Sequence, residues 1–354
     1  MKQLPFGLDI GAHTIKAVWL GASKNGFILQ ATNMIQTPSK GMLSQSPLDQ
    51  EEMARAIQSM VSEARIKTKY VNIALPENQV YTKVIEMPVL SDKELSSAIY
   101  WEAEQYIPIP LSNVMFDYKV LSRPFDMQIK SEQQSKMEVL LVGAPSSLVS
   151  SYQKIAAMSG LSIVSIETEI LATARSLIYP INPDQNQKLP TTLIISIGAV
   201  STSLVIIKNG LLVFTYTIPL GGSAISRAIA SDFGFTLDQA EEYKKVYGIS
   251  KQNFEGKIGK ASEPVLTSIL TEVRKSLAFY KDNHGEDSTI QQVILSGGSA
   301  KLPGLDLFFA ENLGIETVVA NPWKALVSQQ MPKDILDNSP DYSIAVGLAM
   351  RGYD

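Results

Sequence analysis

The sequence predicts an α/β protein made of two related domains that face each other across a cleft. Its 354 residues are more than one ordinary domain needs and enough for two sizeable cores. Short apolar stretches typical of buried strands alternate with longer stretches of helical periodicity. One order of strand, glycine turn and strand also occurs twice, once in each half of the chain.

The first half begins with a run of strands, which we assign to domain I. These strands are expected at residues 6–10, 14–20, 27–35, 70–75 and 80–86, with a helix at 49–66. Domain I then comprises residues 1–86 together with 160–185 and 335–354.

A different kind of segment begins at Pro88 and is predicted to form an inserted subdomain of domain I, residues 87–159. Ser91 and Glu94 form a capping box that opens a helix ending before Pro108. The other elements expected here are strands at 114–121 and 137–142, a polar loop at 130–136 and a helix at 146–159. A strand at 161–166 and a helix at 169–179 return the chain to domain I.

The prolines and asparagines of residues 180–190 predict a linker to domain II, residues 190–334. Its expected strands are 192–197, 203–208, 211–218 and 293–295, and its expected helices are 222–231, 238–247, 263–282 and one that begins near Pro303.

The repeat is visible in individual residues. Ile10-Gly11-Ala12 follows a strand in the first half, and Ile197-Gly198-Ala199 follows one in the second. A Lys-Asn-Gly turn comes 14 residues after Ile10 and 11 residues after Ile197, a difference that we attribute to a three-residue change in turn length. Strand–glycine–strand units are common, so coincidence is the alternative to a duplicated hairpin domain.

Composition excludes several classes of function. There is no cysteine, which fits a reducing, cytoplasmic compartment, and His13 and His284 are the only histidines, which excludes a multi-histidine metal site. The net charge of -4 lacks the excess of positive charge that is typical of proteins that bind nucleic acid or an anionic membrane surface. No apolar stretch reaches the roughly 20 residues of a membrane helix, and no signal peptide is visible, so we expect no direct membrane insertion.

Glycine turns that face each other suit phosphate chemistry, because backbone N–H groups can approach an anion closely where no Cβ intervenes. Neither the P-loop pattern nor G-x-G-x-x-G is present. The nucleotide-binding candidates are Gly11, Ala12, His13, Thr14 and Lys16 in the first turn, Gly198, Ala199 and Val200 in the second, Gly221 and Gly222 after it, and Gly297, Gly298 and Ser299 in a third cluster.

Asp9 and Lys16 flank the first turn. The Asp9 carboxylate is a candidate to order the waters of a bound Mg²⁺, and the Lys16 ammonium to neutralise phosphate. Asp9 as a turn cap, Lys16 as a solvated strand residue and the third glycine cluster as a plain turn are the alternatives.

Taken together, these motifs resemble the superfamily of actin, heat-shock chaperones and sugar kinases. The resemblance rests on residues 9–16, 196–202 and 297–304, and on two segments that resemble its interdomain helices, 169–172 and 345–348. It implies an actin-like ATPase fold of two ribonuclease-H-like domains, with ATP and Mg²⁺ between them.

Within this superfamily, residues 87–121 and 218–248 resemble the PilM family of type IV pilus assembly proteins, relatives of FtsA. The resemblance places Glu241 and Lys244 beside the nucleoside; the residues alone favour the alternative, a surface pair at i and i+3 on a helix. It also implies a cytoplasmic scaffold, peripheral at the inner face of the cytoplasmic membrane, that docks the short cytoplasmic tail of a single-pass, PilN-like protein on domain I. Trp101 and Tyr106 are candidates for that contact, with core packing as the alternative.

The chain departs from the superfamily's pattern at three places. Ser196 stands where an aspartate is usual, Ala12 and His13 stand where small hydroxyl residues are usual, and Glu167 and Glu169 replace an acidic pair that includes aspartate. Asp9 and Glu169 are therefore the catalytic candidates, and we expect ATP to be bound but hydrolysed slowly or not at all.

Other functions stay open on the sequence. A small-molecule kinase would need a catalytic base beside an acceptor pocket, and no residue was placed in that role. An FtsA-like filament protein would carry a membrane anchor beyond Asp354, where this chain stops. A type II secretion scaffold is poorly separated from a pilus scaffold, and self-association is left open.

Overall fold

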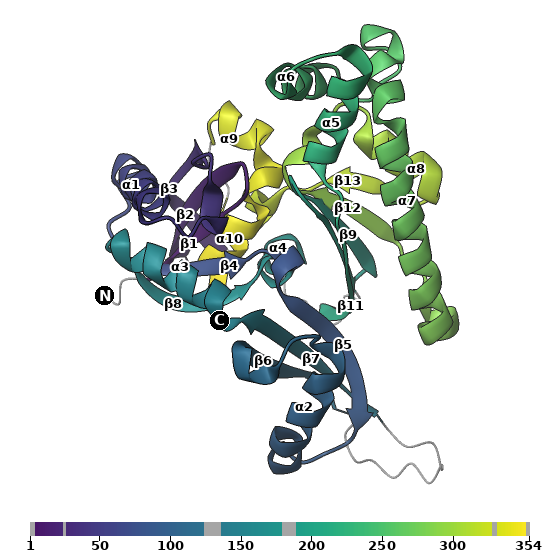
Figure 1. Cartoon of the computed structure of the whole chain (residues 1–354). Coiled ribbons are helices and arrows are strands. Elements are labelled where there is room, and N and C mark those ends of the chain that lie inside the picture. The colour runs from purple at the N-terminus through teal and green to yellow at the C-terminus, as the bar shows by residue number, and fades with distance from the viewer. Residues whose placement is uncertain (1–3, 24–25, 124–135, 179–188, 328–330, 352–354) are drawn as a thin grey trace.

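The computed structural model describes residues 4–23, 26–123, 136–178, 189–327 and 331–351. Two α/β domains lie side by side, and a smaller unit projects below domain I (Figure 1). The predicted linker at 180–190 and loop at 130–136 lie almost wholly outside the described residues, although Lys136 already belongs to a strand.

Domain I is built on a five-stranded sheet. Its order is β3-β2-β1-β4-β8. Strand β2 runs antiparallel to both β1 and β3, whereas β4 runs parallel to both β1 and β8. Its strands are β1 (Phe6–Ile10), β2 (Thr14–Ser23), β3 (Gly26–Gln36), β4 (Tyr70–Leu75) and β8 (Ser162–Thr168). Helices α1 (Pro47–Glu63) and α3 (Ser146–Met158) pack on one face, and α10 (Ser343–Met350) on the other. Every residue of β1 is buried, as expected for a strand covered on both faces.

Domain II repeats this sheet, with the order β11-β10-β9-β12-β13. Its strands are β9 (Thr192–Ile197), β10 (Thr202–Lys208), β11 (Leu211–Ile218), β12 (Gln292–Ser296) and β13 (Thr317–Val319). Helices α5 (Gly222–Phe233), α6 (Leu237–Tyr247), α7 (Lys257–His284) and α8 (Leu305–Leu313) belong to this domain, and α4 (Glu169–Ile178) covers the other face of the sheet. The predicted duplication is confirmed, and it includes a fifth strand, β13, that the sequence analysis missed.

The explanation given for the unequal spacing of the repeat was wrong. The first turn joins Ile10 to Ile15 in one half and Ile197 to Thr202 in the other, so it contains four residues in both. Strand β2 has 10 residues whereas β10 has seven, so the extra length lies in the strand.

The inserted unit is a three-stranded sheet of order β5-β7-β6 with one helix packed on it. Its elements are β5 (Tyr81–Pro88), α2 (Asp92–Tyr106), β6 (Val114–Ser122) and β7 (Lys136–Pro145). The capping box predicted at Ser91 and Glu94 is present. Since β5 starts at Tyr81 and α3 packs in the core of domain I, we propose drawing the insert at 81–145 rather than 87–159.

The C-terminal segment returns to domain I before the predicted boundary at residue 335. Trp323, in a short 3-10 turn (Pro322–Ala325), packs with Phe27 and with α10 in the domain I core. A short helix α9 (Lys333–Asp337) and a second turn (Ser339–Tyr342) follow and lead into α10. No helix in the described part of the chain is long and apolar enough to cross a membrane.

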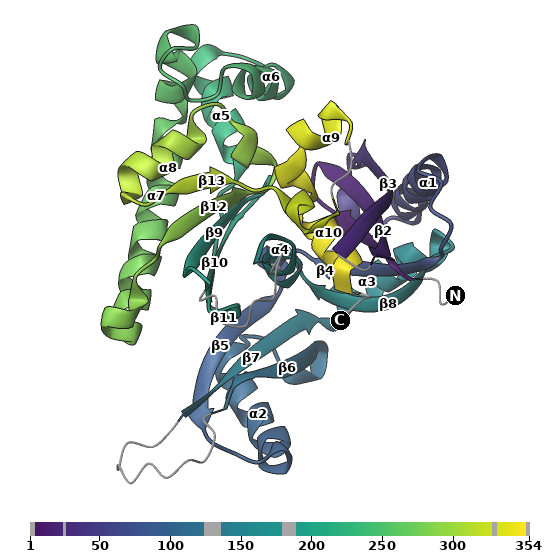
Figure 2. The ribbon, with the colours of Figure 1, turned by 180° about the vertical axis from the view of Figure 1, so that it is seen from behind.

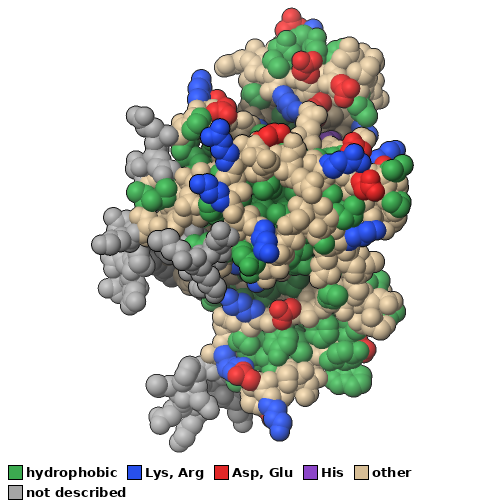
Figure 3. Space-filling view, turned by 90° about the vertical axis from the view of Figure 1, so that its left-hand side faces the viewer, with side chains coloured by type: hydrophobic (Ala, Val, Ile, Leu, Met, Phe, Trp, Pro, Cys, Tyr) green, Lys and Arg blue, Asp and Glu red, His purple; other side chains and the backbone are tan. Residues whose placement is uncertain are grey.

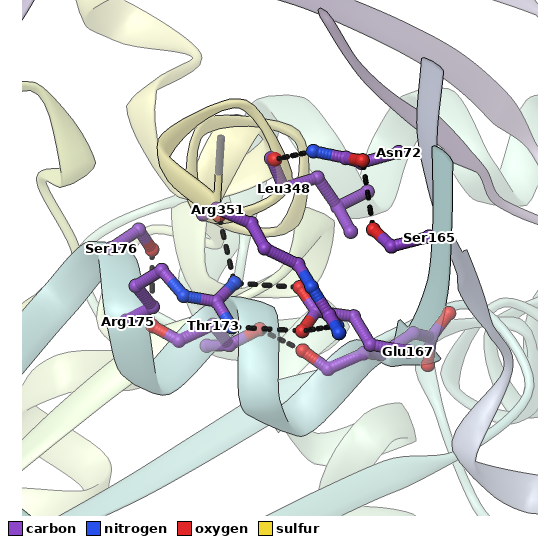
Figure 4. Close-up of polar contacts among 10 residues, drawn as sticks. Asn72, Ser165, Glu167, Thr173, Arg175, Ser176, Leu348 and Arg351 are labelled. Carbon is purple, nitrogen blue, oxygen red and sulfur yellow. Dashed lines mark hydrogen bonds and ion pairs between the residues drawn. The ribbon is translucent and has the colours of Figure 1, made fainter. Parts of the chain in front are cut away.

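Helices α4 and α10 cross between the two sheets (Figure 2). Their backbones approach so closely that a Cβ on Gly347 would collide with the carbonyl oxygen of Ala172. Below the crossing, the buried Glu167 carboxylate accepts from Arg175 and Arg351, at 2.6 Å each (Figure 4). The amide of Asn72 donates to the backbone carbonyl of Leu348 at 2.9 Å, which ties β4 to α10.

Candidate functional site

The two glycine turns are closed by the same backbone hydrogen bond. The N–H of Gly11 donates to the carbonyl of Thr14 at 3.0 Å, and the N–H of Gly198 donates to that of Ser201 at 2.9 Å. The first turn also reaches domain II, because His13 Nε2 lies 3.0 Å from the hydroxyl of Ser223 in the first turn of α5. The two turns therefore lie at the junction of the two domains.

Asp9 and Lys16 are paired across the first hairpin. They are opposite one another on β1 and β2, and Lys16 Nζ donates to Asp9 Oδ2 at 3.0 Å with both side chains buried. Burial alone would lower the pKa of Lys16, but the carboxylates of Asp9, Asp341 and Glu169 outweigh it and raise that pKa. The alternative of a solvated Lys16 is wrong, and the site holds a buried cation instead.

Glu169, the first residue of α4, lies beside this pair. Its Oε2 accepts from the backbone N–H of Glu77 at 3.2 Å. Burial, and to a smaller degree the nearby Asp9, raises the pKa of Glu169 to about 8. The predicted acidic pair is divided, since Glu169 faces Asp9 whereas Glu167 is used by two arginines at the helix crossing.

The second turn carries no charge at the equivalent positions. Ser196 and Ser203 are opposite one another on β9 and β10, as Asp9 and Lys16 are on β1 and β2. The next strand contributes Ser296, which is level with Ser196. Three hydroxyl side chains thus stand on three adjacent strands.

Gly221 and Gly222 lie against the second turn. The N–H of Gly222 donates to the carbonyl of Gly198 at 2.9 Å, and that of Ser223 to the carbonyl of Ala199 at 2.8 Å. A Cβ on Gly221 would lie 2.6 Å from the oxygen of Gly198, so the close approach requires glycine there.

Lys244 is buried against α5 rather than exposed on its helix, so the alternative of a surface pair is wrong. Its Nζ donates to Glu241 at 2.5 Å, to the Ser226 hydroxyl at 2.9 Å and to the carbonyl of Gly222 at 3.1 Å. Burial alone would raise the pKa of Glu241, but the hydrogen bonds from Lys244 and Ser226 lower it to about 2. Burial lowers the pKa of Lys244 despite this pairing.

The third glycine cluster closes the site. Gly297 has a φ of +80°, and a Cβ on it would lie 2.6 Å from the carbonyl oxygen of Ile197. A Cβ on the neighbouring Gly222 would collide with the hydroxyl of Ser299, which places this cluster beside α5. The alternative of a plain turn therefore does not account for its packing.

Asp341 is a residue of this region that the sequence analysis missed. Its carboxylate forms an ion pair with Lys301 at 2.6 Å, and its Oδ1 would lie 3.1 Å from a Cβ on Gly298. Asp341 is 43 positions beyond Gly298, and no spacing pattern links the two. Only the return of the C-terminal segment to domain I brings them together.

The structure thus gathers the predicted turn residues of both halves, the third cluster and the Glu241–Lys244 pair in one region. Trp101 and Tyr106 lie elsewhere, on α2 of the insert. Trp101 is 70% exposed, so core packing is wrong for it. Tyr106 packs on the core of the insert with Lys83 Nζ 4.5 Å from its ring centre, so core packing describes it well.

Two domains with the same strand order, glycine turns that meet at their junction and a crossed pair of connecting helices define an actin-like ATPase fold. The family model described as type IV pilus assembly protein PilM matches residues 7–353, so the chain belongs to the PilM family.

Known proteins agree with this assignment. A chain from a solved PilM–PilN type IV pilus biogenesis complex is 29% identical, with a TM-score of 0.83 over 99% of this chain and 98% of that one. The cell division protein FtsA of Streptococcus pneumoniae is 23% identical over 89% of this chain and 75% of its own length. MreB5 of Spiroplasma citri bound to AMPPNP has the same fold, with 15% identity and a TM-score of 0.53 over 98% of this chain and 95% of that one.

Proposed function

We propose that this chain is an ATP-binding scaffold of type IV pilus assembly, held at the inner face of the cytoplasmic membrane by a PilN-like partner. The observation that carries the proposal is the similarity, over 99% of the chain, to a protein solved in a PilM–PilN complex. The scaffold has two parts, a nucleotide cleft between the domains and a partner surface on the insert.

The cleft offers groups suited to each part of ATP. The two glycine turns present backbone to the phosphates, and Lys16 supplies a buried positive charge beside them. We infer that the adenine ring lies against the backbone of Gly297 and Gly298, and that Lys244 with Glu241 supplies polar groups for the ribose.

A Mg²⁺ ion fits this site only in hydrated form. Among the described residues, no three His, Cys, Asp or Glu side chains are grouped so that they could hold a metal ion. Asp9, which lies beside the first turn, would orient the waters of an ion carried in with the phosphates. When bound, the ion would neutralise phosphate charge.

Calorimetry on nucleotide-free protein tests the cleft. We expect ATP with Mg²⁺ to bind, and Lys244→Ala to weaken binding at least tenfold because it removes three hydrogen bonds at the site. Lys245→Ala is the matched control, since Lys245 is exposed on the same helix. Absence of binding heat at millimolar ATP would refute the nucleotide part.

Hydrolysis should be slow or absent. Ser196 carries no charge with which to polarise water, and losing one such group often costs on the order of 10²–10³ in rate. Glu169 is a weak substitute, because its pKa of about 8 leaves it mostly protonated at neutral pH. Phosphate release of about one per second or faster that Asp9→Ala abolishes would contradict this; Ser196→Asp should raise whatever rate is found.

The partner surface lies where α2 meets the free edge of β6. β6 is an edge strand, and on the face that α2 covers the Tyr100 ring lies 6.0 Å from Phe116 and 6.2 Å from Trp101. Figure 3 shows hydrophobic side chains gathered on one face of the insert. An extended tail added to β6 would gain main-chain hydrogen bonds, with these aromatic side chains supplying specificity.

A synthetic peptide of the PilN-like protein's cytoplasmic tail, from the same source, tests this surface. We expect it to shift the fluorescence of Trp101, which is far more exposed than the buried Trp323. Trp101→Ala should weaken peptide binding about tenfold or more, since exposed aromatics often dominate such contacts. Phe279→Ala, at a similarly exposed aromatic on domain II, should leave it unchanged. If both variants lose peptide binding equally, or if neither variant loses it, the partner surface lies elsewhere.

A further inference from the structure

The two faces of the insert's sheet pack against different parts of the molecule. Successive side chains of a strand point to opposite faces, and β7 shows this clearly. Val139 and Leu141 belong to the core beneath α2. Leu140 and Val142 belong to a second apolar cluster on the opposite face, where Leu140 is only 3% exposed. A part of the molecule other than α2 therefore buries this side of the insert.

Domain II and α4 bury it. β5 of the insert contacts β11 of domain II (Figure 1), and across this contact the hydroxyl of Thr215 donates to the carbonyl of Thr82 at 2.9 Å. We call the shared apolar cluster the seam. The insert contributes Val84, Leu121, Leu140 and Val142 to it, and the sheet of domain II contributes Ile194, Val205, Ile207, Leu212 and Ile294.

The insert is attached to domain I at its two chain ends. Val80, directly before β5, and Ala144, near the end of β7, pack in the core of domain I. None of the described residues between these two belongs to that core. The insert therefore shares an apolar core with domain II and α4, and contributes only its two ends to the core of domain I.

The seam ends where the face of the insert becomes polar. Val84 and Leu140 are opposite one another on β5 and β7, and both belong to the seam. The next pair on the same face, farther from domain I, is Glu86 and Glu138, and Lys136 forms an exposed ion pair with Glu86 at 2.6 Å. Such a change is expected of a face that is covered by a neighbour over part of its length and reaches solvent beyond it.

We propose that the insert moves as one body with domain II and rotates relative to domain I about its two chain ends. Separating the seam would expose apolar surface to water and leave voids in a packed core, so the seam resists sliding. A few residues at the ends of strands, by contrast, are the usual place of a hinge. A contact made on the insert is then transmitted to the domain II side of the cleft. This inference goes beyond the proposed function and depends on neither nucleotide nor partner.

Distances between pairs of spin labels on the nucleotide-free chain test which body the insert belongs to. The chain has no cysteine, so labels can be placed at exposed glutamates. Glu104→Cys on α2 is combined with Glu52→Cys on α1 of domain I, or with Glu263→Cys on α7 of domain II. We expect the distribution of distances from the insert to domain I to be at least about twice as wide as that from the insert to domain II. Equal widths, or the reverse order, would overturn the proposal.

Two neighbouring leucines provide matched variants for the seam. Leu140→Ala removes a side chain from the seam, and Leu141→Ala removes the same side chain from the core beneath α2. We expect Leu140→Ala to raise amide exchange in β10 and β11 about fivefold or more and to leave β1 and β4 unchanged, because the lost packing loosens domain II locally. Leu141→Ala should raise exchange in the insert alone.

If the two variants affect β10 and β11 equally, or if Leu140→Ala raises exchange in β1 and β4 instead, the seam does not join the insert to domain II and the proposal fails. If Leu140→Ala does not fold, Leu140→Val and Leu141→Val make the same comparison with a smaller truncation. Absence of ATP binding would refute the nucleotide part of the proposed function and would leave these distances and exchange rates unaffected.

Discussion

The two hairpin turns have the same backbone hydrogen bond but different side chains beside it. Asp9 and Lys16 form a buried ion pair beside the first turn, whereas Ser196 and Ser203 occupy the equivalent positions beside the second. Each turn is closed by the same N–H to carbonyl bond, from Gly11 and from Gly198. Duplication therefore preserved the geometry that presents backbone to a ligand and concentrated the charge in domain I.

The sheets differ in a second way. Gly7 on β1 is equivalent to Ile194 on β9, two positions before Asp9 and Ser196 respectively. A Cβ on Gly7 would collide with the backbone of α10 at Ala345, whereas Ile194 packs in a core with Ile170 of α4. Helix α10 therefore lies closer to the sheet of domain I at Gly7 than α4 lies to the sheet of domain II at Ile194.

The largest expected effect follows from this difference. Gly7→Ala should destabilise the chain by at least about 4 kcal/mol, because the new methyl group meets fixed helix backbone rather than a flexible side chain. Ile194→Val, the equivalent change in domain II, should cost only about 1 kcal/mol. Urea unfolding of both variants measures this, and similar losses would mean that the two sheet–helix contacts are equivalent.

The charged pair comes next. Asp9→Ala leaves Lys16 buried without its partner and should cost about 3 kcal/mol at pH 7. Ser196→Ala removes one hydroxyl from a partly exposed position and should stay within about 0.5 kcal/mol. The same urea experiment compares them. A loss below about 1 kcal/mol for Asp9→Ala would show that Glu169 and Asp341 hold Lys16 without it.

Much of this fold could be predicted because its signals are local. Buried strands such as β4 and β9 are short apolar runs, and their predicted limits match the structure. Strand β13 was missed because it has three residues and two of them are exposed. We propose an earlier start for the insert, because Tyr81–Pro88 has the apolar pattern of any strand and only its pairing with β7 distinguishes it from the strands of domain I.

The site was harder to predict where it depends on distant segments. Glycine turns have a local signature, so Gly11, Gly198 and Gly297 could be found from the sequence. Glu167 and Glu169 are two residues apart, yet strand β8 ends between them and they face different surroundings. Asp341 has no sequence pattern that marks it, because tertiary packing alone brings it beside Gly298.

Stability should fall as pH rises, owing to the carboxyl groups of domain I. Burial raises the pKa of Glu169 to about 8 and that of Glu77 to about 7, so the folded chain keeps protons that the unfolded chain releases above about pH 4.5. The stabilisation is complete below the unfolded pKa and is lost as pH rises through the folded one. From pH 5 to pH 9 the loss should be on the order of 2–4 kcal/mol.

Glu169→Gln separates this effect from the rest of the chain. The variant cannot titrate at that position, so its stability should change less between pH 5 and pH 9 than that of the parent. Glu241→Gln is the contrasting variant, because the pKa of Glu241 is lowered to about 2 and it titrates outside this range. An unchanged pH dependence in Glu169→Gln would mean that its carboxyl group is ionised in the folded chain.

The smallest expected effect concerns the contact that joins the two turns across the domain junction. His13 and Val200 occupy equivalent positions, the second of each turn after its glycine. His13 reaches Ser223 at 3.0 Å, whereas the Val200 side chain is half exposed.

An exposed hydrogen bond contributes about 0.5–1 kcal/mol, so His13→Ala should barely change Tm. It should nevertheless loosen the start of α5, and amide exchange at Gly222 and Ser223 should rise about two- to fivefold. Val200→Ala removes no hydrogen-bonding group and should leave exchange unchanged. If His13→Ala also leaves exchange unchanged, the two domains are held together by the crossing of α4 and α10 rather than at the turns.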